Sequence, residues 1–178
     1  TFSGIPANGD VGATSVKVTA TDGSNASVSD EFDLSVANTN DAPVVANPIA
    51  DQTATEDAAF SFTISANTFT DVDAGDTLAD SASLADGSAL PSWLSFDQAT
   101  RAFSGAPGNG DVGAISVEVT ATDSAGATAT SAFDLTVLNV NDAPVAMDDA
   151  ASVAEDGVLV ASGNALANDG DVDTGTVL

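Results

Sequence analysis

The sequence repeats itself at a distance of 101 residues, and this repeat constrains the fold more than any other feature. When residues 1–44 are aligned with residues 102–145, 28 of the 44 positions are identical. The Asn-Asp-Ala-Pro motif at 40–43 recurs at 141–144. Self-similarity at a fixed period is typical of proteins built from serial structural units. The period is about the length of one β-sandwich domain of roughly 100 residues.

The repeat divides the chain into one whole unit and two partial ones. The Asp-Val-Asp motif at 71–73 recurs at 171–173, so the third unit stops soon after this motif. Thr1 aligns with Ala102, in the interior of a unit, and we therefore expect the chain to be part of a longer protein. The predicted divisions are residues 1–39 (C-terminal part of one unit), 40–142 (a complete unit) and 143–178 (N-terminal part of a third).

Alternation of apolar and polar residues predicts β-strands in the complete unit. Apolar side chains occupy every second position at 60–64, 115–119 and 133–137, which is the period of half-buried strands. Stretches rich in Gly, Asp and Pro separate these segments, and none has useful helical periodicity. We therefore predict an all-β protein of sandwich units, with Trp93 and Leu94 in the core. The Asn-Gly-Asp motif is interpreted as a β-turn, because it occurs once per unit.

The charge balance excludes several classes of partner and site. The chain has 27 acidic and 2 basic residues, a net charge of −25, and no His or Cys. It cannot neutralise phosphates, so we expect neither nucleic acid nor anionic membranes as partners, and no apolar run is long enough for membrane insertion. Val, Leu, Ile and Phe total 41 of 178 residues, above the roughly 20% below which acidic chains are disordered. The remaining ligands are hard oxygens, which suit calcium or magnesium.

Three carboxylates lie within six residues at 71–76. If the backbone is extended, Asp71 and Asp73 project to one face. A turn at Gly75 would bring Asp76 to the same point. Two carboxylates about 5 Å apart repel by roughly 0.8 kcal/mol even in water, so such clustering favours a bound cation. The alternatives are a solvated acidic turn here and, for the Asn-Asp-Ala-Pro linkers, an Asx-turn that bonds only its own backbone.

The complete unit carries a series of motifs in a fixed order: Asn-Asp-Ala-Pro, Thr-Glu-Asp, Asp-Val-Asp-Ala-Gly-Asp, Leu-Pro-Ser-Trp-Leu-Ser-Phe-Asp, Phe-Ser-Gly-Ala-Pro and Val-Thr-Ala-Thr-Asp. This order resembles a dystroglycan-type cadherin-like (CADG) repeat of bacterial surface and secreted proteins. Residues 143–178 resemble the start of the cadherin-like tandem repeats of very large adhesins. The resemblance implies tandem Ig-like or cadherin-like antiparallel β-sandwiches of seven strands, with calcium (Ca²⁺) at their junctions.

Carried over to this sequence, the cadherin pattern implies two calcium sites. The family's Asp-Arg-Glu motif has no clear match; the nearest stretch is 95–98, which contains Asp97. The ligands implied at the first junction are Asn38, Asn40, Asp41, Asp71, Asp73 and Asp123. Those implied at the second junction are Glu56, Asn139, Asn141, Asp142, Asp171 and Asp173.

The leading hypothesis is a non-catalytic, calcium-binding spacer or adhesion segment of a large bacterial surface or secreted protein, placed extracellularly or on the cell surface. Its expected partners are calcium and the neighbouring repeats of the same protein. The alternative is a calcium-dependent module that recognises carbohydrate or a like domain. Sugar platforms normally need exposed aromatic residues, and this chain has one Trp and no Tyr. An enzyme is not expected, because the carboxylates recur once per unit at the junctions and no His or Cys accompanies them.

Overall fold

The structure is a computed structural model that describes residues 3–73, 75–152, 155–156 and 163–173. These residues form β-strands, two short 3₁₀ turns and loops, with no α-helix among them. The described part contains no helix with the length and apolarity needed to cross a membrane. The elements are η1 (Asn8–Asp10), β1 (Gly12–Thr21), β2 (Ser27–Val36), β3 (Val44–Val45), β4 (Gln52–Thr55), β5 (Phe60–Thr63), β6 (Phe69–Thr70), β7 (Ala79–Leu84), β8 (Leu94–Asp97), β9 (Ala102–Gly105), η2 (Asn109–Asp111), β10 (Gly113–Thr122) and β11 (Thr128–Leu138).

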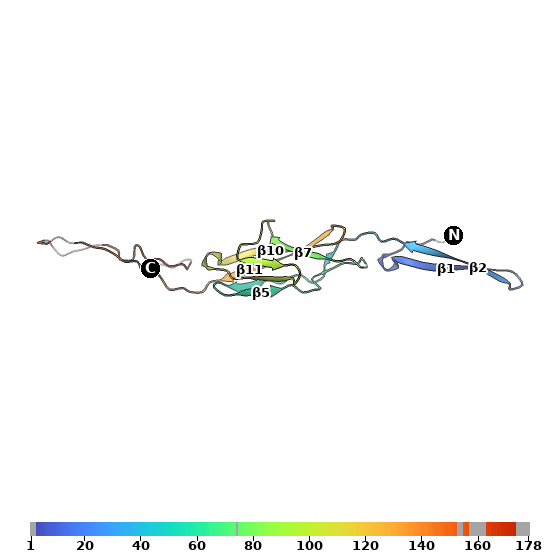
Figure 1. Cartoon of the computed structure of the whole chain (residues 1–178), viewed down its shortest axis with the longest axis horizontal. Helices are drawn as coiled ribbons and strands as arrows, with labels where there is room; N and C mark the ends of the chain where they lie inside the picture. Colours follow the sequence, from blue (N-terminus) through green and yellow to red (C-terminus); the bar gives the residue numbers. More distant parts are fainter. Residues whose placement is uncertain (1–2, 74, 153–154, 157–162, 174–178) are drawn as a thin grey trace.

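Strands β3 to β11 build a two-layer sandwich in the middle of the chain (Figure 1). One layer has the strand order β4-β11-β10-β7, and the other has the order β5-β9-β8. The two-residue strands β3 and β6 pair separately. All pairings are antiparallel except that of β4 with β11, which is parallel. The prediction of an all-β sandwich is confirmed.

The core lies between the two layers and follows the predicted alternation. On β10 and β11, Val117, Leu135 and their inward neighbours are almost fully buried, while the residues between them are more exposed. Phe133 of β11 contacts the rings of the opposite layer, with its centroid 5.7 Å from Phe103 and 5.9 Å from Phe62. Such edge-to-face pairs add to the burial energy of the rings. The aromatic contacts therefore hold the layers together.

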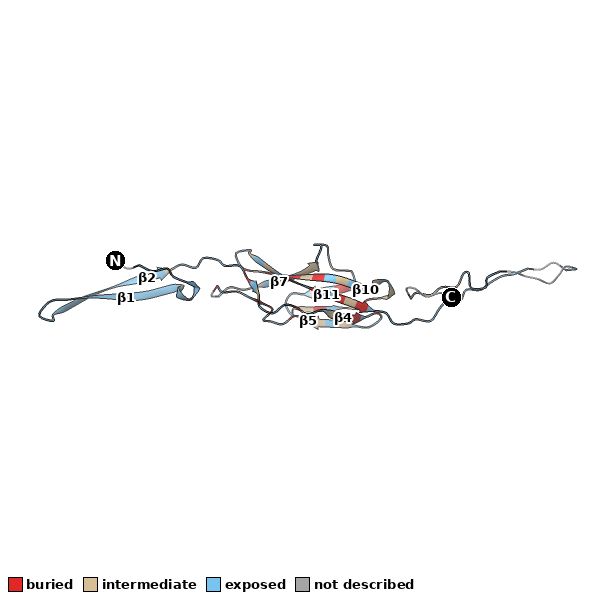
Figure 2. Ribbon diagram, turned by 180° about the vertical axis from the view of Figure 1, so that it is seen from behind, coloured by how far each residue is buried: buried red, intermediate tan, exposed pale blue. Residues whose placement is uncertain are grey.

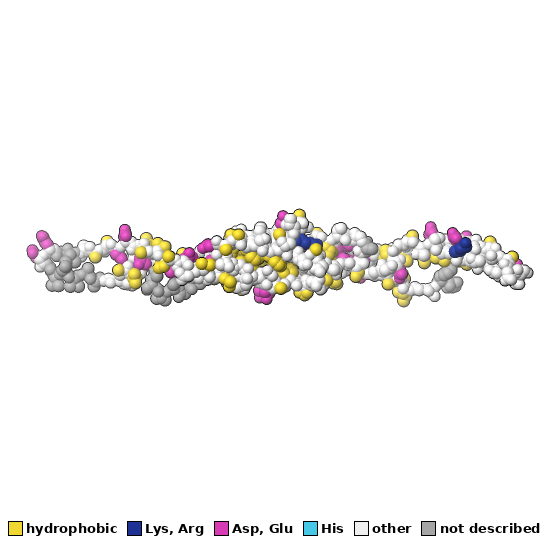
Figure 3. Space-filling model, turned by 90° about the horizontal axis from the view of Figure 1, so that it is seen from below, with side chains coloured by type: hydrophobic (Ala, Val, Ile, Leu, Met, Phe, Trp, Pro, Cys, Tyr) yellow, Lys and Arg dark blue, Asp and Glu magenta, His cyan; other side chains and the backbone are white. Residues whose placement is uncertain are grey.

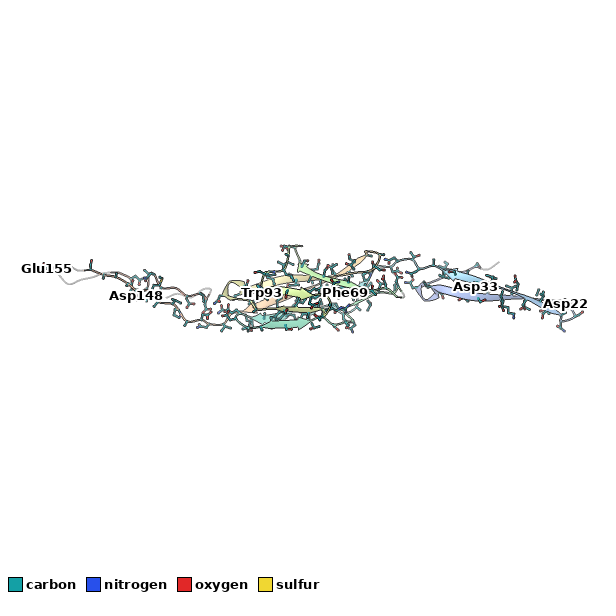
Figure 4. The ribbon with its side chains drawn as sticks, viewed as in Figure 1. Asp22, Asp33, Phe69, Trp93, Asp148 and Glu155 are labelled. Atoms are coloured by element: carbon teal, nitrogen blue, oxygen red, sulfur yellow. The ribbon has the colours of Figure 1, made fainter. Side chains whose placement is uncertain are left out.

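Trp93 and Leu94 belong to the core region, as predicted. Leu94 is buried, and Trp93 is partly buried against the core and lies in the body of the sandwich (Figure 4). The backbone of Trp93 passes so close to Gly105 that a Cβ atom built on Gly105 would lie 2.0 Å from the Trp93 carbonyl oxygen. This close approach explains why a glycine ends β9.

Gly105→Ala is expected to lower the free energy of unfolding of the sandwich by about 3 kcal/mol, the upper range for an overpacked site, because a backbone atom cannot move aside like a side chain. Gly110→Ala is the matched control, since a Cβ there meets no atom within 4 Å. Urea denaturation of both variants measures the difference. Equal stability of the two variants would contradict this packing.

Residues before the sandwich form a two-stranded ribbon that repeats the local structure of β10 and β11. In the ribbon Gly12 pairs with Val36, and in the sandwich Gly113 pairs with Val137, so the register is the same after the 101-residue shift. The burial differs, because no second layer among the described residues covers the ribbon (Figure 2). Leu34, for example, is half exposed, whereas its equivalent Leu135 is fully buried.

The segment after the sandwich begins in the same way as the complete unit. Val145 pairs with Gly170 through two backbone hydrogen bonds of 2.7 and 3.0 Å, which correspond to the pairing of β3 with β6. The ribbon and this segment lie on opposite sides of the sandwich, and the molecule is elongated (Figure 1). Asp22, in the ribbon's turn, and Glu155 mark its two ends (Figure 4). The two junctions therefore lie at opposite ends of the sandwich, and we call these ends its poles.

Candidate metal sites

On the face shown in Figure 3, acidic side chains occur along the length of the molecule, and the basic side chains lie in two patches that are far apart. Among the described residues, two sets of acids have carboxylate oxygens that lie within 4.8 Å of one another. The first set comprises Asp71, Asp76 and Asp123, and we call it the first acidic group. The second comprises Glu56, Asp142 and Asp173, and we call it the second acidic group.

Loop hydrogen bonds bring the first acidic group together at the junction with the ribbon. Asp71 follows β6, and one of its oxygens accepts the backbone N–H of Asp73 at 2.9 Å. Asp76 accepts the N–H of Ser124 at 3.3 Å, which joins the β6–β7 loop to the turn between β10 and β11. Asp123 opens that turn and accepts two of its N–H groups. Carboxylates about 50 residues apart in sequence therefore meet at one pole.

The Asn-Asp-Ala-Pro linker is tied to this pole by both of its polar residues. The Asn40 amide donates to Asp123 at 2.9 Å, and the Asp41 N–H donates to Asp73 at 2.8 Å. The hydrogen bond from Asn40, helped by the N–H groups of Ala125 and Ala127, lowers the pKa of Asp123 below its usual value, although burial opposes this effect. A lowered pKa keeps the carboxylate ionised and able to bind a cation at neutral pH.

The second acidic group lies at the other pole and joins three parts of the chain. Glu56 directly follows β4, Asp142 belongs to the second linker, and Asp173 belongs to the third unit. Glu56 accepts the N–H of Val140 at 2.6 Å. The Asp142 N–H donates to Asp173 at 2.8 Å. This last bond repeats the Asp41–Asp73 contact of the first junction.

Three acids at the two poles have one oxygen held by a backbone N–H and the other buried without a hydrogen-bond partner in the described part of the chain. These oxygens are Oε2 of Glu56, Oδ2 of Asp71 and Oδ1 of Asp73. Glu56 is only 1% exposed and Asp73 only 7%. A buried carboxylate oxygen without a partner is unfavourable unless a cation or a donor meets it.

The donor set fits calcium. Both poles offer carboxylate and amide oxygens, and the chain has no His or Cys for a zinc-type site. Calcium takes six to eight oxygen ligands in flexible geometry, and these poles combine rigid backbone-anchored carboxylates with linker residues. Both poles thus offer oxygen ligands of the kind that calcium binds. At the first they come from the first acidic group with Asn40 and Asp73, and at the second from the second acidic group with its linker.

The other predicted ligands fall at the junctions with differing contacts. Asn139 donates to Asp173 at 3.1 Å, and Asp171 accepts the N–H of Asp173 at 2.9 Å. Asn141 donates to the backbone oxygen of Asp142. Asn38 is exposed beside the first linker and makes no hydrogen bond with the first acidic group.

Asp97 lies outside both acidic groups. Its side chain accepts the N–H groups of Ala99 and Thr100 in the β8–β9 turn, so it serves that turn.

The Asn-Gly-Asp motif reaches the junctions instead, a contact that the sequence interpretation missed. The motif forms the 3₁₀ turns η1 and η2, in which the N–H of Asp10 donates to Ala7 and that of Asp111 to Gly108 as in the predicted β-turn. Asn8 donates to Asp41 at 2.6 Å, and Asn109 donates to Asp142 in the same way. The signal was present in the repeat, since both the turn and the linker recur at an offset of 101.

Comparison with solved structures places the fold among cadherin domains. Protocadherin gamma B7 (extracellular cadherin domains 1–4) is similar over 86% of this chain and 39% of its own, with 19% identity and a TM-score of 0.57. Human mucin-like protocadherin EC1-2 is similar over 76% and 72%, with 16% identity and a TM-score of 0.56. Mouse cadherin-23 EC22-24 is similar over 72% and 43%, with 19% identity and a TM-score of 0.52.

At these identities the likeness concerns the fold alone, and this chain spans less than half the length of the first and third structures. The predicted Ig-like or cadherin-like β-sandwich is confirmed. No curated protein sequence matches the chain. A family profile described as "Putative Ig domain" (He_PIG) matches residues 42–138, which contain every strand of the sandwich. The chain belongs to the He_PIG family of Ig domains.

Proposed function

We propose that this chain is a calcium-binding, non-catalytic spacer in which cations bound at the two poles stiffen the junctions between sandwich units. The observation that carries the proposal is the Glu56 carboxylate. It is almost completely buried, one oxygen is held by Val140, and the other faces no partner among the described residues. A cation shared with Asp142 and Asp173 would satisfy it.

The positions of the ligands support a role in rigidity. The second acidic group takes one carboxylate from the sandwich, one from the linker and one from the third unit. An ion held by all three would join two units across the linker and add to the hydrogen bonds that Val140 and Asp142 already make there. Without the ion, the three like charges repel one another and favour separation. Extracellular modules bind calcium at about 10⁻⁴ to 10⁻³ M, so such sites would fill outside the cell.

The proposal extends to the kind of protein that contains this chain and to its location. The repeat in the sequence and the serial poles fit a string of units divided at 1–39, 40–142 and 143–178. We place that string in a CADG-type surface or secreted bacterial protein, extracellular, with an adhesive or spacing role. Trp93 is partly buried against the core, which argues against an aromatic sugar platform. We therefore propose calcium and neighbouring units as its partners.

Calcium is expected to raise the melting temperature of the chain by about 10 °C or more. At free calcium near 100 times the dissociation constant, one site specific to the native state adds about 2.7 kcal/mol, and each kcal/mol shifts a domain of this size by about 4–8 °C. Differential scanning calorimetry in millimolar calcium and in chelator measures the shift.

Sodium chloride at equal ionic strength is the necessary control, because screening alone stabilises a chain with a net charge of −25. Magnesium at the same concentration tests selectivity, since it demands a stricter octahedral site. The proposal fails if calcium and sodium chloride of matched ionic strength give the same melting temperature.

A further inference from the structure

We propose that Asn109, and Asn8 at the preceding junction, are positioning residues: their side-chain amides clamp the linker carboxylate and hold each junction in its binding geometry before a cation arrives. The inference rests on the proposed function for its effect on calcium, but the clamp itself acts without any ion. The amide does not act as a metal ligand. It orients the linker carboxylate, which is Asp41 at the first junction and Asp142, a member of the second acidic group, at the second.

The same chain of hydrogen bonds occurs at both junctions. At the first, Asn8 donates to the Asp41 side chain at 2.6 Å, and the Asp41 N–H donates to Asp73 at 2.8 Å. At the second, Asn109 donates to Asp142, and the Asp142 N–H donates to Asp173 at 2.8 Å. Two independent copies of one contact, made by residues 33 positions apart, indicate a built feature rather than a chance approach.

The turn that carries the asparagine is itself fixed. In η2 the Asp111 side chain accepts the N–H of Gly108 at 2.9 Å, while its own N–H donates to the Gly108 oxygen at 2.8 Å. η1 repeats both bonds between Asp10 and Ala7. Because the turn is closed in this way, the asparagine that opens it projects from a rigid base.

The turn is also tied to the segment that holds Glu56. Asp57 follows Glu56, and its N–H donates to the oxygen of Pro107 at 2.8 Å, just before the turn. Pro107 is fully buried. The clamp and the buried carboxylate are therefore fixed to one framework at this pole, so the Asn109 amide sets the distance from Asp142 to Glu56.

A neutral amide is the side chain this position requires. It donates one hydrogen bond to the Asp142 carboxylate and brings no further negative charge to three acids that already lie close together. An aspartate there would repel Asp142 and could not donate when ionised. An alanine would leave the Asp142 carboxylate without this donor. The carboxylate would then turn away from Glu56 and Asp173.

The test uses the full chain in the presence of chelator. The sequence has no cysteine, so spin labels attach only at introduced sites, for example Thr100→Cys in the sandwich and Ala165→Cys in the third unit, both at exposed positions. Double electron–electron resonance then measures the distribution of distances between the two labels, which widens when the junction adopts more orientations. Asn109→Ala is expected to broaden the distance distribution, and Asn109→Asp to broaden it further. Asn8→Ala is the matched control: it makes the same change in the other junction and is expected to leave this distribution unchanged.

Calcium titration by calorimetry supplies the second measurement. Loss of a group that orients a metal ligand typically weakens metal binding by 10- to 100-fold, so Asn109→Ala is expected to raise the dissociation constant of one site by about 10-fold. If the wild-type chain binds no calcium, the proposed function fails, while the distances in chelator still test the clamp. An unchanged distance distribution in Asn109→Ala, or one that Asn8→Ala broadens equally, overturns the clamp.

Discussion

Glu56→Gln is expected to stabilise the sandwich in chelator and to remove most of its stabilisation by calcium. In chelator the wild-type carboxylate is a buried charge with one oxygen unpartnered, beside Asp142 and Asp173. Glutamine has the same shape and keeps the bond from Val140 without the charge. Relieving the desolvation cost of a buried oxygen without a partner is worth about 1–3 kcal/mol. In calcium the variant lacks a ligand, so a gain of about 2.7 kcal/mol largely disappears.

Urea denaturation of both proteins, with calcium and with chelator, measures the four free energies. Glu118→Gln is the matched control, because it makes the same charge change on β10, outside the acidic groups. The expected result is a reversal, in which the wild type is the more stable protein in calcium and Glu56→Gln the more stable one in chelator. If the calcium gain of Glu56→Gln equals that of the wild type, Glu56 is not a ligand.

Arg101→Ala is expected to lower the free energy of unfolding by about 3–5 kcal/mol, the usual effect of leaving one member of a buried ion pair alone. Arg101 lies in the β8–β9 turn, and its Nε is 2.8 Å from the carboxylate of Asp80 on β7, in the opposite layer. The Asp80 side chain is only 1% exposed and that of Arg101 is 29% exposed. Arg101 also donates to the backbone oxygen of Ala66 at 3.0 Å.

Denaturation of a double-mutant cycle with Asp80→Ala isolates this pair. Removing both partners is expected to be much less destabilising than the sum of the single changes, because no buried charge is left over. Lys17→Ala is the control at the only other basic residue. Lys17 and Glu31 are 3.5 Å apart but more than half exposed, so the change is expected to be within about 1 kcal/mol. Equal effects of the two substitutions would contradict the assignment of Asp80 and Arg101 as a buried pair.

The strands and the core could be predicted from the sequence because both depend on local patterns. The alternation at 115–119 and 133–137 selected the inward residues correctly, and the antiparallel pairing of these strands follows from their closeness in the chain. The repeat also predicts the pairing of the ribbon, because the ribbon and the sandwich share one register after the 101-residue shift. The all-β class and the positions of these strands therefore needed no knowledge of distant contacts, whereas strands such as β4 and β7 were not predicted.

The contacts made by loops could not be predicted in the same way. The donation from Asn109 to Asp142 joins residues whose closeness depends on how a turn and a linker meet at one pole. The family pattern drew attention to Asp97, whose carboxylate closes its own turn. The pairing of Asp80 with Arg101 crosses the two layers and leaves no periodic trace. Each depends on tertiary geometry, which a residue pattern does not encode.

The parallel pairing of β4 with β11 has a mechanical consequence. The chain enters the sandwich through the short strand β3, continues into β4 and leaves directly after β11. β4 and β11 are paired in register from Leu135 opposite Gln52 to Leu138 opposite Thr55. A pull on the two linkers draws the paired strands in opposite directions along their common axis. Such a load shears all the ladder hydrogen bonds at once, whereas a load across the strands would open them one at a time. A load applied through the two linkers would therefore meet the pairing of β4 with β11 in shear.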